Sequence, residues 1–246
     1  MGVFSDLKIL YHMVARPVRG KTHASRMENF YGGQAKNYDD FRKRLLKGRE
    51  ELWQHLGVNE GETWLDMGGG TGANLEAFGD DIRKLKKVYV VDLAGSLLKM
   101  AEQRAASHGW DNVTTAEADA TKFVPEEQQV DVVTFSYSLT MIPDWFAAIQ
   151  HAHKLLKPGG RIGVVDFYVS RKHPDEQHLK HGWPTRSFWP VWFASDNVFP
   201  SPDHVPFLHR LFEPVHFEER KTRLPWFPIP FFKTPYYLFI GQKREN

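Results

Sequence analysis

A cluster of glycines is the part of this sequence best suited to hold a small molecule. Residues 64–72 read W-L-D-M-G-G-G-T-G, a short apolar strand followed by a glycine-rich turn. Because glycine has no Cβ, such a turn between a strand and a helix lets the backbone pack against a bound ligand. The spacing is neither the G-x-G-x-x-G of dinucleotide enzymes nor the G-x-x-x-x-G-K-[ST] of phosphate loops, and no lysine follows it. The turn predicts a nucleotide-type crevice, with a purely structural turn as the alternative.

Two aspartates further along the chain could complete this crevice. Asp92 closes the second expected strand, where an acidic side chain can accept hydrogen bonds from two ribose hydroxyls. A helix N-cap is the alternative role for Asp92. Asp119, followed by Ala120, comes just after the third expected strand and is either a second ligand-binding carboxylate or a plain turn residue.

The segments that must position these residues alternate between strand and helix patterns. We expect strands at residues 63–67, 87–92, 113–117, 130–136 and 161–166, and helices at residues 72–78, 96–108 and 144–156. Residues 236–243 alternate like an edge strand. This order indicates an α/β fold with a mostly parallel sheet, helices on both faces and a ligand crevice beyond the carboxyl ends of the strands.

The two ends of the chain have their own patterns. Apolar side chains at helical spacing predict a short helix at residues 4–15 and a longer one at about residues 38–55. Basic residues crowd the first fifth of the chain, as solvated helix faces or as contacts to an anionic membrane surface. Residues 181–232 are rich in aromatic residues and prolines, and because proline breaks helices we expect loops there. They form either a packed cap or, at residues 226–232, an apolar wedge in a lipid interface.

Composition limits the protein class. The 246 residues are 41% hydrophobic and 25% charged, which is ordinary for one folded domain, and the net charge of +2 argues against a nucleic-acid partner. There is no cysteine, so disulfides and thiolate metal sites are excluded and a reducing compartment fits. The apolar runs are too short for a membrane-spanning helix, and we see no signal peptide. We therefore expect a cytoplasmic protein that is soluble or peripherally membrane-associated, at the endoplasmic reticulum if eukaryotic.

The glycine-rich turn resembles motif I of the class I S-adenosylmethionine-dependent methyltransferases. Four motifs together, F-Y-G-G-Q-A-x-x-Y-D-x-x-R, R-L-L-K-G-R-E, W-L-D-M-G-G-G-T-G and F-S-Y-S-L-T-M-I-P-D-W, resemble the N-methylating domain of betaine-lipid synthases. The resemblance covers the chain from about residue 30 to its end. It implies a Rossmann-like, doubly wound, mostly parallel seven-stranded sheet in a single domain. It divides residues 1–246 into an N-terminal helical lid (1–56), a cofactor-binding core (57–170) and an aromatic-rich C-terminal cap (171–246).

The resemblance also implies roles for individual residues, with S-adenosyl-L-methionine as the cofactor. Asp66 would organise the glycine loop and the methionine amino group, Asp92 would bind the ribose and Asp119 the adenine amino group. On the lid, Tyr31 and Tyr38 would close the site and Arg42 would lie near the methionine carboxylate, although core filling is the alternative for a tyrosine there. The predicted cofactor-binding residues are Tyr38, Arg42, Asp66, Gly68, Gly69, Gly70, Asp92, Leu93, Asp119, Ala120 and Ser136.

The family reaction is three successive methylations of diacylglyceryl-homoserine to the trimethylated betaine lipid. Aromatic faces attract methylated ammonium groups, so Tyr31, Tyr137 and Tyr168 are the predicted catalytic residues. We expect a lipid head group as acceptor, membrane contact through the aromatic loops, no metal, and an aminocarboxypropyl-transferring enzyme or domain as a possible partner. The alternatives are methylation of phosphatidylethanolamine or of a soluble amine, phenol or quinone precursor, and a non-catalytic cofactor-binding partner of a synthase.

Overall fold

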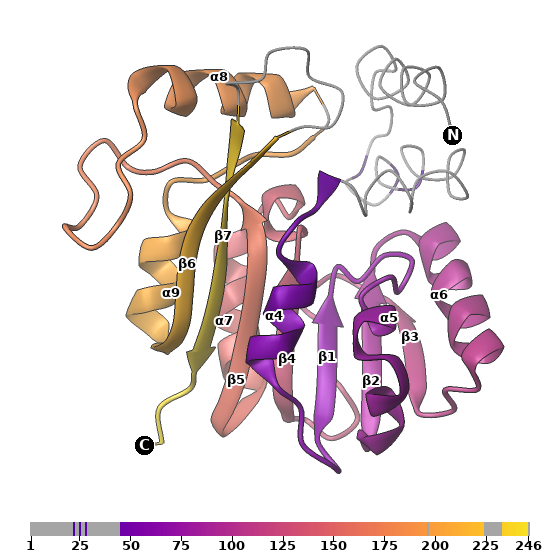
Figure 1. Ribbon diagram of the computed structural model, residues 1–246. Helices are drawn as coiled ribbons and strands as arrows, with labels where there is room; N and C mark the ends of the chain where they lie inside the picture. The colour runs from indigo at the N-terminus through magenta and orange to yellow at the C-terminus, as the bar shows by residue number, and fades with distance from the viewer. Residues whose placement is uncertain are drawn as a thin grey trace.

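A seven-stranded sheet forms the centre of the structure (Figure 1). The computed structural model describes residues 22, 25, 28, 45–195, 197–223 and 233–245. The strands are β1 (Thr63–Met67), β2 (Lys87–Asp92), β3 (Val113–Glu117), β4 (Val130–Ser136), β5 (Leu156–Phe167), β6 (Glu213–Arg223) and β7 (Lys233–Gln242). The helices are α4 (Arg49–Leu56), α5 (Leu75–Phe78), α6 (Gly95–His108), α7 (Trp145–Leu155), α8 (Trp183–Ala194) and α9 (His204–Leu211), with 3₁₀ turns η1 (Gly79–Lys84) and η2 (Leu139–Met141).

The strand order is β3-β2-β1-β4-β5-β7-β6, and β1 to β5 are parallel. The chain runs outward from β1 to β3 and then returns to place β4 on the other side of β1. Such a reversal opens a crevice at the carboxyl ends of the two central strands. The expected α/β, doubly wound, mostly parallel sheet of seven strands is confirmed.

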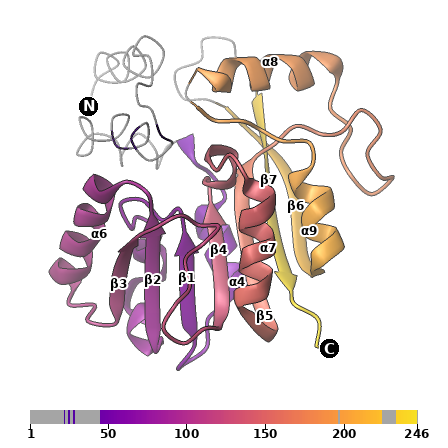
Figure 2. The ribbon, with the colours of Figure 1, turned by 180° about the vertical axis from the view of Figure 1, so that it is seen from behind.

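Each face of the sheet has its own apolar core, because side chains of a strand point alternately to opposite faces. Trp64 and Val88 pack on one face with residues of α4, α5 and α6, whereas Leu65 and Tyr89 pack on the other with residues of α7 and α9. Figure 2 shows α7 and α9 covering this second face. Helix α8 lies beyond the carboxyl ends of the parallel strands, at the top of Figure 1.

Four strand predictions, for β1 to β4, match the structure to the residue. The strand expected at residues 161–166 is longer, since Leu156 already pairs with Val130. The helix expected at residues 72–78 is confined to α5, because Gly72 and Gly79 both have positive φ. The helix expected at residues 38–55 is interrupted within the described residues: Leu45 is helical, residues 46–48 form a bend and turn, and α4 begins at Arg49 after Gly48, whose φ is 83°.

Two predictions about the C-terminal third were wrong. The strand at residues 236–243 is not an edge strand, because β7 lies between β5 and β6 and pairs antiparallel with both. The aromatic segment is not free of regular helix, because it contains α8 and α9. Pro184 and Pro206 lie in the first turns of these helices, where the missing N–H has no intrahelical partner to lose. Pro190 lies inside α8, whose buried Trp189 and Phe193 hold it on the core.

Three sequence predictions concern residues outside the described ones: the helix at residues 4–15, the motif at residues 30–42 and the wedge at residues 226–232. Within the described ranges, no helix combines the length and the apolar character that crossing a membrane requires.

Candidate active site

The glycine loop follows β1 and is folded tightly against its neighbours. The backbone amides of Gly68 and Gly69 donate to the carbonyl oxygen of Val91, at 2.7 and 3.1 Å. Gly68 has a φ of +70°, and a Cβ added there would lie 2.5 Å from the Cβ of Ser138. A Cβ on Gly69 would lie 2.7 Å from an oxygen of Asp66. Only glycine fits at these two positions, so the turn is built for close approach.

Asp66 lies beneath this loop and is fully buried. Its two carboxylate oxygens accept hydrogen bonds from the Asn74 amide at 2.8 Å and the Thr134 hydroxyl at 2.7 Å. Burial raises the pKa of Asp66 to about 6, against the lowering effect of these hydrogen bonds. The position is consistent with an organising role for Asp66 in the loop.

Asp92 ends β2 and binds backbone amides after β1 and after its own strand. One of its oxygens accepts from the Gly70 amide and the other from the Ala94 amide, each at 2.9 Å. Asp119 lies after β3, and one of its oxygens accepts from both the amide and the hydroxyl of Thr121. Both carboxylates are therefore held in place by local hydrogen bonds, and both line the same cavity.

This cavity, of about 330 Å³, lies at the carboxyl ends of β1, β2 and β4. Seven of the predicted site residues line it, namely Gly68, Gly70, Asp92, Leu93, Asp119, Ala120 and Tyr137. Sequence reasoning missed several others, namely Leu97, Ala118, Thr121, Ser138, Met141, Ile142 and Asp144. The position of Ser138, Met141, Ile142 and Asp144 in the F-S-Y-S-L-T-M-I-P-D-W motif was the signal that could have identified them.

The charge of the cavity wall has one sign. Among the described lining residues there are three carboxylates, Asp92, Asp119 and Asp144, and no lysine, arginine or histidine. Asp144 is exposed at the rim and caps α7 by accepting a hydrogen bond from the Ala147 amide. The wall therefore favours a cationic ligand over an anionic one.

Tyr137 contributes a buried aromatic ring to the cavity from an uncommon backbone conformation, with a φ of 54°. Its hydroxyl donates to the carbonyl oxygen of Lys47 at 2.6 Å, and the Arg49 guanidinium lies 5.7 Å from the ring centre. Arg49 also donates to the Ser136 hydroxyl at 2.9 Å. Ser136 thus fixes the start of α4 and does not line the cavity, and Arg49, within the R-L-L-K-G-R-E motif, is a neighbour of the site that sequence reasoning missed.

A second cavity, of about 440 Å³, lies on the other side of the glycine loop. Its lining is more polar and includes Arg49, Gly69, Asn74 and Arg104. Gly69 is therefore the predicted loop residue that faces α4, whereas Gly68 borders both cavities.

The structure does not bring Tyr168 to the main cavity. Its buried hydroxyl donates to Glu219 at 2.6 Å, and the ring borders a separate cavity of about 20 Å³. Tyr31, Tyr38 and Arg42 lie outside the described residues, so their predicted roles stay predictions.

One group of described residues has metal-ligand spacing, although we predict no metal. Ligand atoms of His55, His216 and Glu218 lie within 4.8 Å of one another. Glu218 is already engaged by the Arg220 guanidinium, which lowers the pKa of this carboxyl. None of the three residues lines the main cavity.

The main cavity fits an adenosyl group with a positive charge. Gly68 and Gly70 line it with backbone alone, Leu93, Leu97 and Ala120 offer apolar surface for a base, and the carboxylates suit ribose hydroxyls and a sulfonium. The strand order, the glycine loop and the carboxylate after β2 define the class I methyltransferase fold.

The chain belongs to the ubiE/COQ5 methyltransferase family, whose sequence profile matches residues 20–183. The ubiquinone/menaquinone biosynthesis C-methyltransferase UbiE of Escherichia coli (strain K12 / DH10B) is 28% identical over 162 residues, which cover 63% of this chain and 64% of UbiE. This chain thus spans less than two thirds of the length of the curated relatives it matches.

Two solved structures illustrate the shared fold. The N-methyltransferase NodS from Bradyrhizobium japonicum WM9, in complex with S-adenosyl-L-homocysteine, has a TM-score of 0.60 at 16% identity and covers 86% of this chain and 92% of its own. Haemonchus contortus Phospholethanolamine N-methyltransferase 2, with phosphomonomethylethanolamine and S-adenosylhomocysteine, has a TM-score of 0.64 at 15% identity and covers 92% of this chain and 61% of its own. The family and these bound products imply S-adenosylmethionine as the cofactor, as the sequence predicts.

Proposed function

We propose that this protein transfers methyl groups from S-adenosylmethionine to the amino nitrogen of a lipid head group, and that diacylglyceryl-homoserine is the acceptor. The observation that carries the proposal is the charge of the main cavity. Its described lining combines three carboxylates with the face of Tyr137 and contains no cationic side chain. The motif set shared with the N-methylating domain of betaine-lipid synthases supports the choice of acceptor.

The chemistry of amine methylation suits such a wall. S-adenosylmethionine supplies an electrophilic methyl group on a positively charged sulfur. The neutral amine attacks this carbon, the carbon–sulfur bond breaks with its electron pair going to sulfur, and the positive charge moves to nitrogen. The product loses a proton to solvent before the next transfer, and the trimethylated nitrogen has none to lose. The positive charge stays on the reacting sulfur or nitrogen throughout, so a carboxylate near these atoms favours every stage. The carboxylate of the homoserine head group needs a cationic partner from outside the described lining of this cavity.

The residues of the chain supply position more than covalent help. Alignment of a nucleophile with its target can account for much of a rate enhancement. The glycine loop and the turn from Ser138 to Met141 pack against each other, and both line the cavity. Each aromatic face near a methylated ammonium stabilises it by about 0.5–2 kcal/mol through cation–π attraction. Tyr137 is placed for this contact among the described residues.

Asp144 is the carboxylate best placed to recognise the acceptor amine. Asp92 ends β2 and Asp119 follows β3, and we assign ribose and adenine to them, whereas Asp144 lies at the rim beside Met141 and Ile142. We assign to Asp144 the attraction of the ammonium group before it is deprotonated and methylated.

A lipid acceptor fits the apolar surface beyond the strand ends. Trp183 and Val191 on α8 are 73% and 78% exposed, and Phe199 after this helix is 54% exposed. We propose peripheral attachment to a cytoplasmic membrane surface through this region, which lies at the same end of the sheet as the cavity (Figure 1). An aminocarboxypropyl-transferring enzyme would supply the homoserine head group and is the proposed partner.

C-methylation of a quinone precursor is the second candidate, favoured by the 28% identity to UbiE. Carbon methylation of a phenolic ring builds on the electron-rich phenolate form. Asp144, the carboxylate assigned to the acceptor side of the cavity, would disfavour that anion. The N-methyl proposal therefore accounts better for the charge of Asp144.

A transfer assay with methyl-labelled S-adenosylmethionine tests the proposal. The acceptors are diacylglyceryl-homoserine and phosphatidylethanolamine in mixed micelles, and a demethylated quinol in a parallel reaction. We expect mono-, di- and trimethylated homoserine lipids. If the homoserine lipid stays unlabelled, diacylglyceryl-homoserine is rejected as the acceptor, whether the label appears in phosphatidylethanolamine, in the quinol or in no product.

The variant Asp144→Asn gives the assay a residue-level test. Asparagine caps a helix about as well as aspartate, so the change removes charge while keeping α7 capped. We expect the KM for the homoserine lipid to rise about fivefold, with little change in the KM for S-adenosylmethionine. Asp80→Asn, at an exposed position of η1, is the matched control and should change neither value.

A further inference from the structure

Asp166 is a buried carboxylate that borders the active site without lining it. It lies near the end of β5 with no exposed surface. One of its oxygens accepts from the Thr140 hydroxyl at 2.8 Å and from the Phe167 amide at 2.8 Å, and the other accepts from the Thr140 amide at 3.1 Å. Two of these three donors belong to a single residue, Thr140.

Thr140 is the middle residue of η2, the short turn at the wall of the main cavity. Its carbonyl oxygen accepts from the Phe199 amide at 2.8 Å, so all three of its polar groups are engaged. Its neighbours along the turn, Ser138 and Met141, line the cavity. The hydrogen bonds between Asp166 and Thr140 therefore fix the position of this wall, and they also fix the segment after α8 that binds to Thr140.

The same turn touches the glycine loop. The Ser138 hydroxyl donates to the carbonyl oxygen of Met67 at 2.8 Å, and the Cβ of Ser138 occupies the space where a side chain on Gly68 would stand. Because Ser138 contacts the loop directly, a shift of the turn would also displace the glycine loop, and both line the cavity.

We propose that Asp166 is a positioning residue for this active site, whose ionised carboxylate holds the turn at Thr140 against the glycine loop. The inference concerns the cavity of the proposed function and rests on that function for its place in catalysis. Binding of S-adenosylhomocysteine tests it without any acceptor.

The charge of Asp166 decides how strongly it holds these donors. An ionised carboxylate makes charge-assisted hydrogen bonds, which are about twice as strong as those that a neutral carboxyl accepts. Burial raises the pKa of Asp166 to about 7, which places its titration in the range of ordinary assays. The ionisable neighbours that act with it are the phenols of Tyr137 and Tyr237, whose pKa values are raised well above the usual range. Both phenols stay neutral near pH 7, and Arg49, over the ring of Tyr137, stays charged.

The experiment measures the Kd of S-adenosylhomocysteine by calorimetry for the wild-type protein and for Asp166→Asn, from pH 6 to pH 8.5. We expect the variant to bind about tenfold more weakly at pH 8, as for the loss of a hydrogen bond to a charged group. The ratio of the two Kd values should approach one at pH 6, because the wild-type carboxyl is then protonated. Asp66, with a pKa of about 6, titrates in both proteins, so its effect cancels in the ratio.

Two variants of Thr140 test the route of the effect and do not depend on the folding of Asp166→Asn. Thr140→Val removes the hydroxyl donor, which should raise the pKa of Asp166 further and move the pH dependence of binding upward. Thr140→Ser keeps the hydroxyl and should restore wild-type binding.

Asp131→Asn is the control, since Asp131 is a hydrogen-bonded carboxylate near the opposite ends of the strands. We expect the Kd of S-adenosylhomocysteine for this control to stay within twofold of wild type at every pH. The proposal would be overturned if the ratio of the Kd values of Asp166→Asn and wild type were independent of pH, or if it equalled the ratio for the control. Binding that follows the expected pattern with no transfer to any amine would refute the proposed function alone.

Discussion

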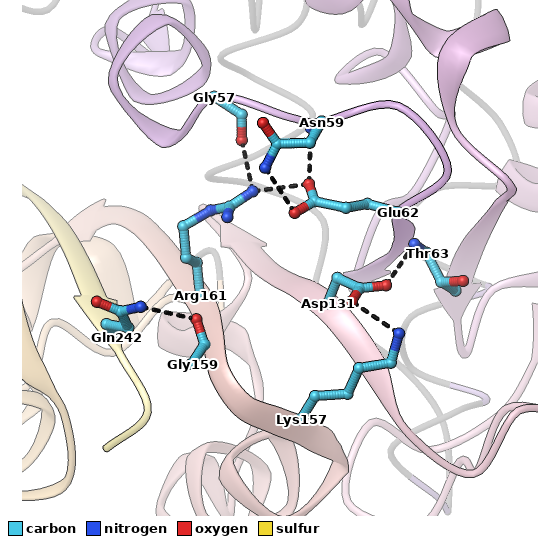
Figure 3. Close-up of polar contacts among 9 residues, drawn as sticks. All are labelled: Gly57, Asn59, Glu62, Thr63, Asp131, Lys157, Gly159, Arg161 and Gln242. Atoms are coloured by element: carbon cyan, nitrogen blue, oxygen red, sulfur yellow. Dashed lines mark hydrogen bonds and ion pairs between the residues drawn. The ribbon is translucent and has the colours of Figure 1, made fainter. Parts of the chain in front are cut away.

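The two ends of the parallel sheet treat carboxylates in opposite ways. At the amino ends of the strands, Asp131 binds Lys157 at 2.7 Å, and Glu62 binds Arg161 at 2.7 Å (Figure 3). At the carboxyl ends, Asp66 and Asp166 are fully buried and accept hydrogen bonds from neutral donors.

This contrast shows where the protein gains stability and where it gives some up. An ion pair with good geometry can stabilise a fold, whereas a buried charge held by neutral groups costs free energy. The costly carboxylates are those that shape the cavity. Active sites commonly concentrate such groups, because the geometry that binds a ligand differs from the geometry that best stabilises the fold.

The largest effect should come from the pH dependence of stability. Folding raises the pKa of Asp166 from 3.8 to about 7, so the folded state binds this proton more tightly than the unfolded state. The stabilisation of the fold by this bound proton is complete below pH 4 and is lost as the pH rises through 7. The free energy of unfolding should therefore fall by on the order of 4 kcal/mol over this range, since one pKa unit corresponds to about 1.4 kcal/mol.

Urea denaturation of the wild type and Asp166→Asn between pH 4 and pH 8 measures this effect. The variant should show a flatter decline in the free energy of unfolding with pH. Parallel curves for the two proteins would mean that Asp166 does not titrate in this range, and the contrast between the two ends would lose its main support.

The next effect concerns the glycine loop. Gly68→Ala places a Cβ in a strained conformation and 2.5 Å from the Cβ of Ser138. We expect the affinity for S-adenosylhomocysteine to fall about 100-fold, or about 3 kcal/mol, because the turn must move to relieve the clash.

Gly61→Ala is the matched control at the amino end of β1. Gly61 has a φ of +80°, similar to that of Gly68, but a Cβ added there would have nothing within 4 Å. This variant should lose about 1 kcal/mol of stability and no affinity. Equal losses of affinity in both variants would show that backbone strain, and not the contact with Ser138, is responsible.

A smaller effect is expected for the ion pair at the amino ends. The Arg161 guanidinium also donates to the Gly57 carbonyl at 3.0 Å, and both partners of the pair are largely covered. Arg161→Ala should lower the free energy of unfolding by about 2 kcal/mol and leave S-adenosylhomocysteine binding unchanged. Calorimetric titration beside urea denaturation checks both values, and a weakened affinity would mean that the two ends are coupled.

The smallest effect is expected for Gln242, whose side chain donates to the Gly159 carbonyl at 3.0 Å on the exposed edge of the same region (Figure 3). Gln242→Ala should change the free energy of unfolding by less than about 0.5 kcal/mol, because water replaces an exposed hydrogen bond. A larger loss would show that this turn contributes to the sheet beyond its own contact.

The central strands and the glycine loop could be predicted from the sequence alone. The patterns at residues 63–67, 87–92, 113–117 and 130–136 predicted β1 to β4 to the residue, because a buried parallel strand needs a short apolar run between turn residues. The sequence also predicted that Gly68, Asp92 and Asp119 lie at one crevice, and in the structure they line one cavity, since their order along alternating strands and helices is a local property of the chain.

The contacts made across the sheet could be learned only from the folded chain. Four features depend on segments far apart in sequence. Strand β7 lies between β5 and β6, and α8 is helical although it contains Pro190. Tyr168 binds Glu219 away from the main cavity, and Asp166 binds Thr140. Local propensity carries no information about such partners, because burial against a distant surface can outweigh the cost of a proline or of a charge. The strand ends could therefore be predicted from the sequence, whereas the contacts that hold the turn at Thr140 in place could not.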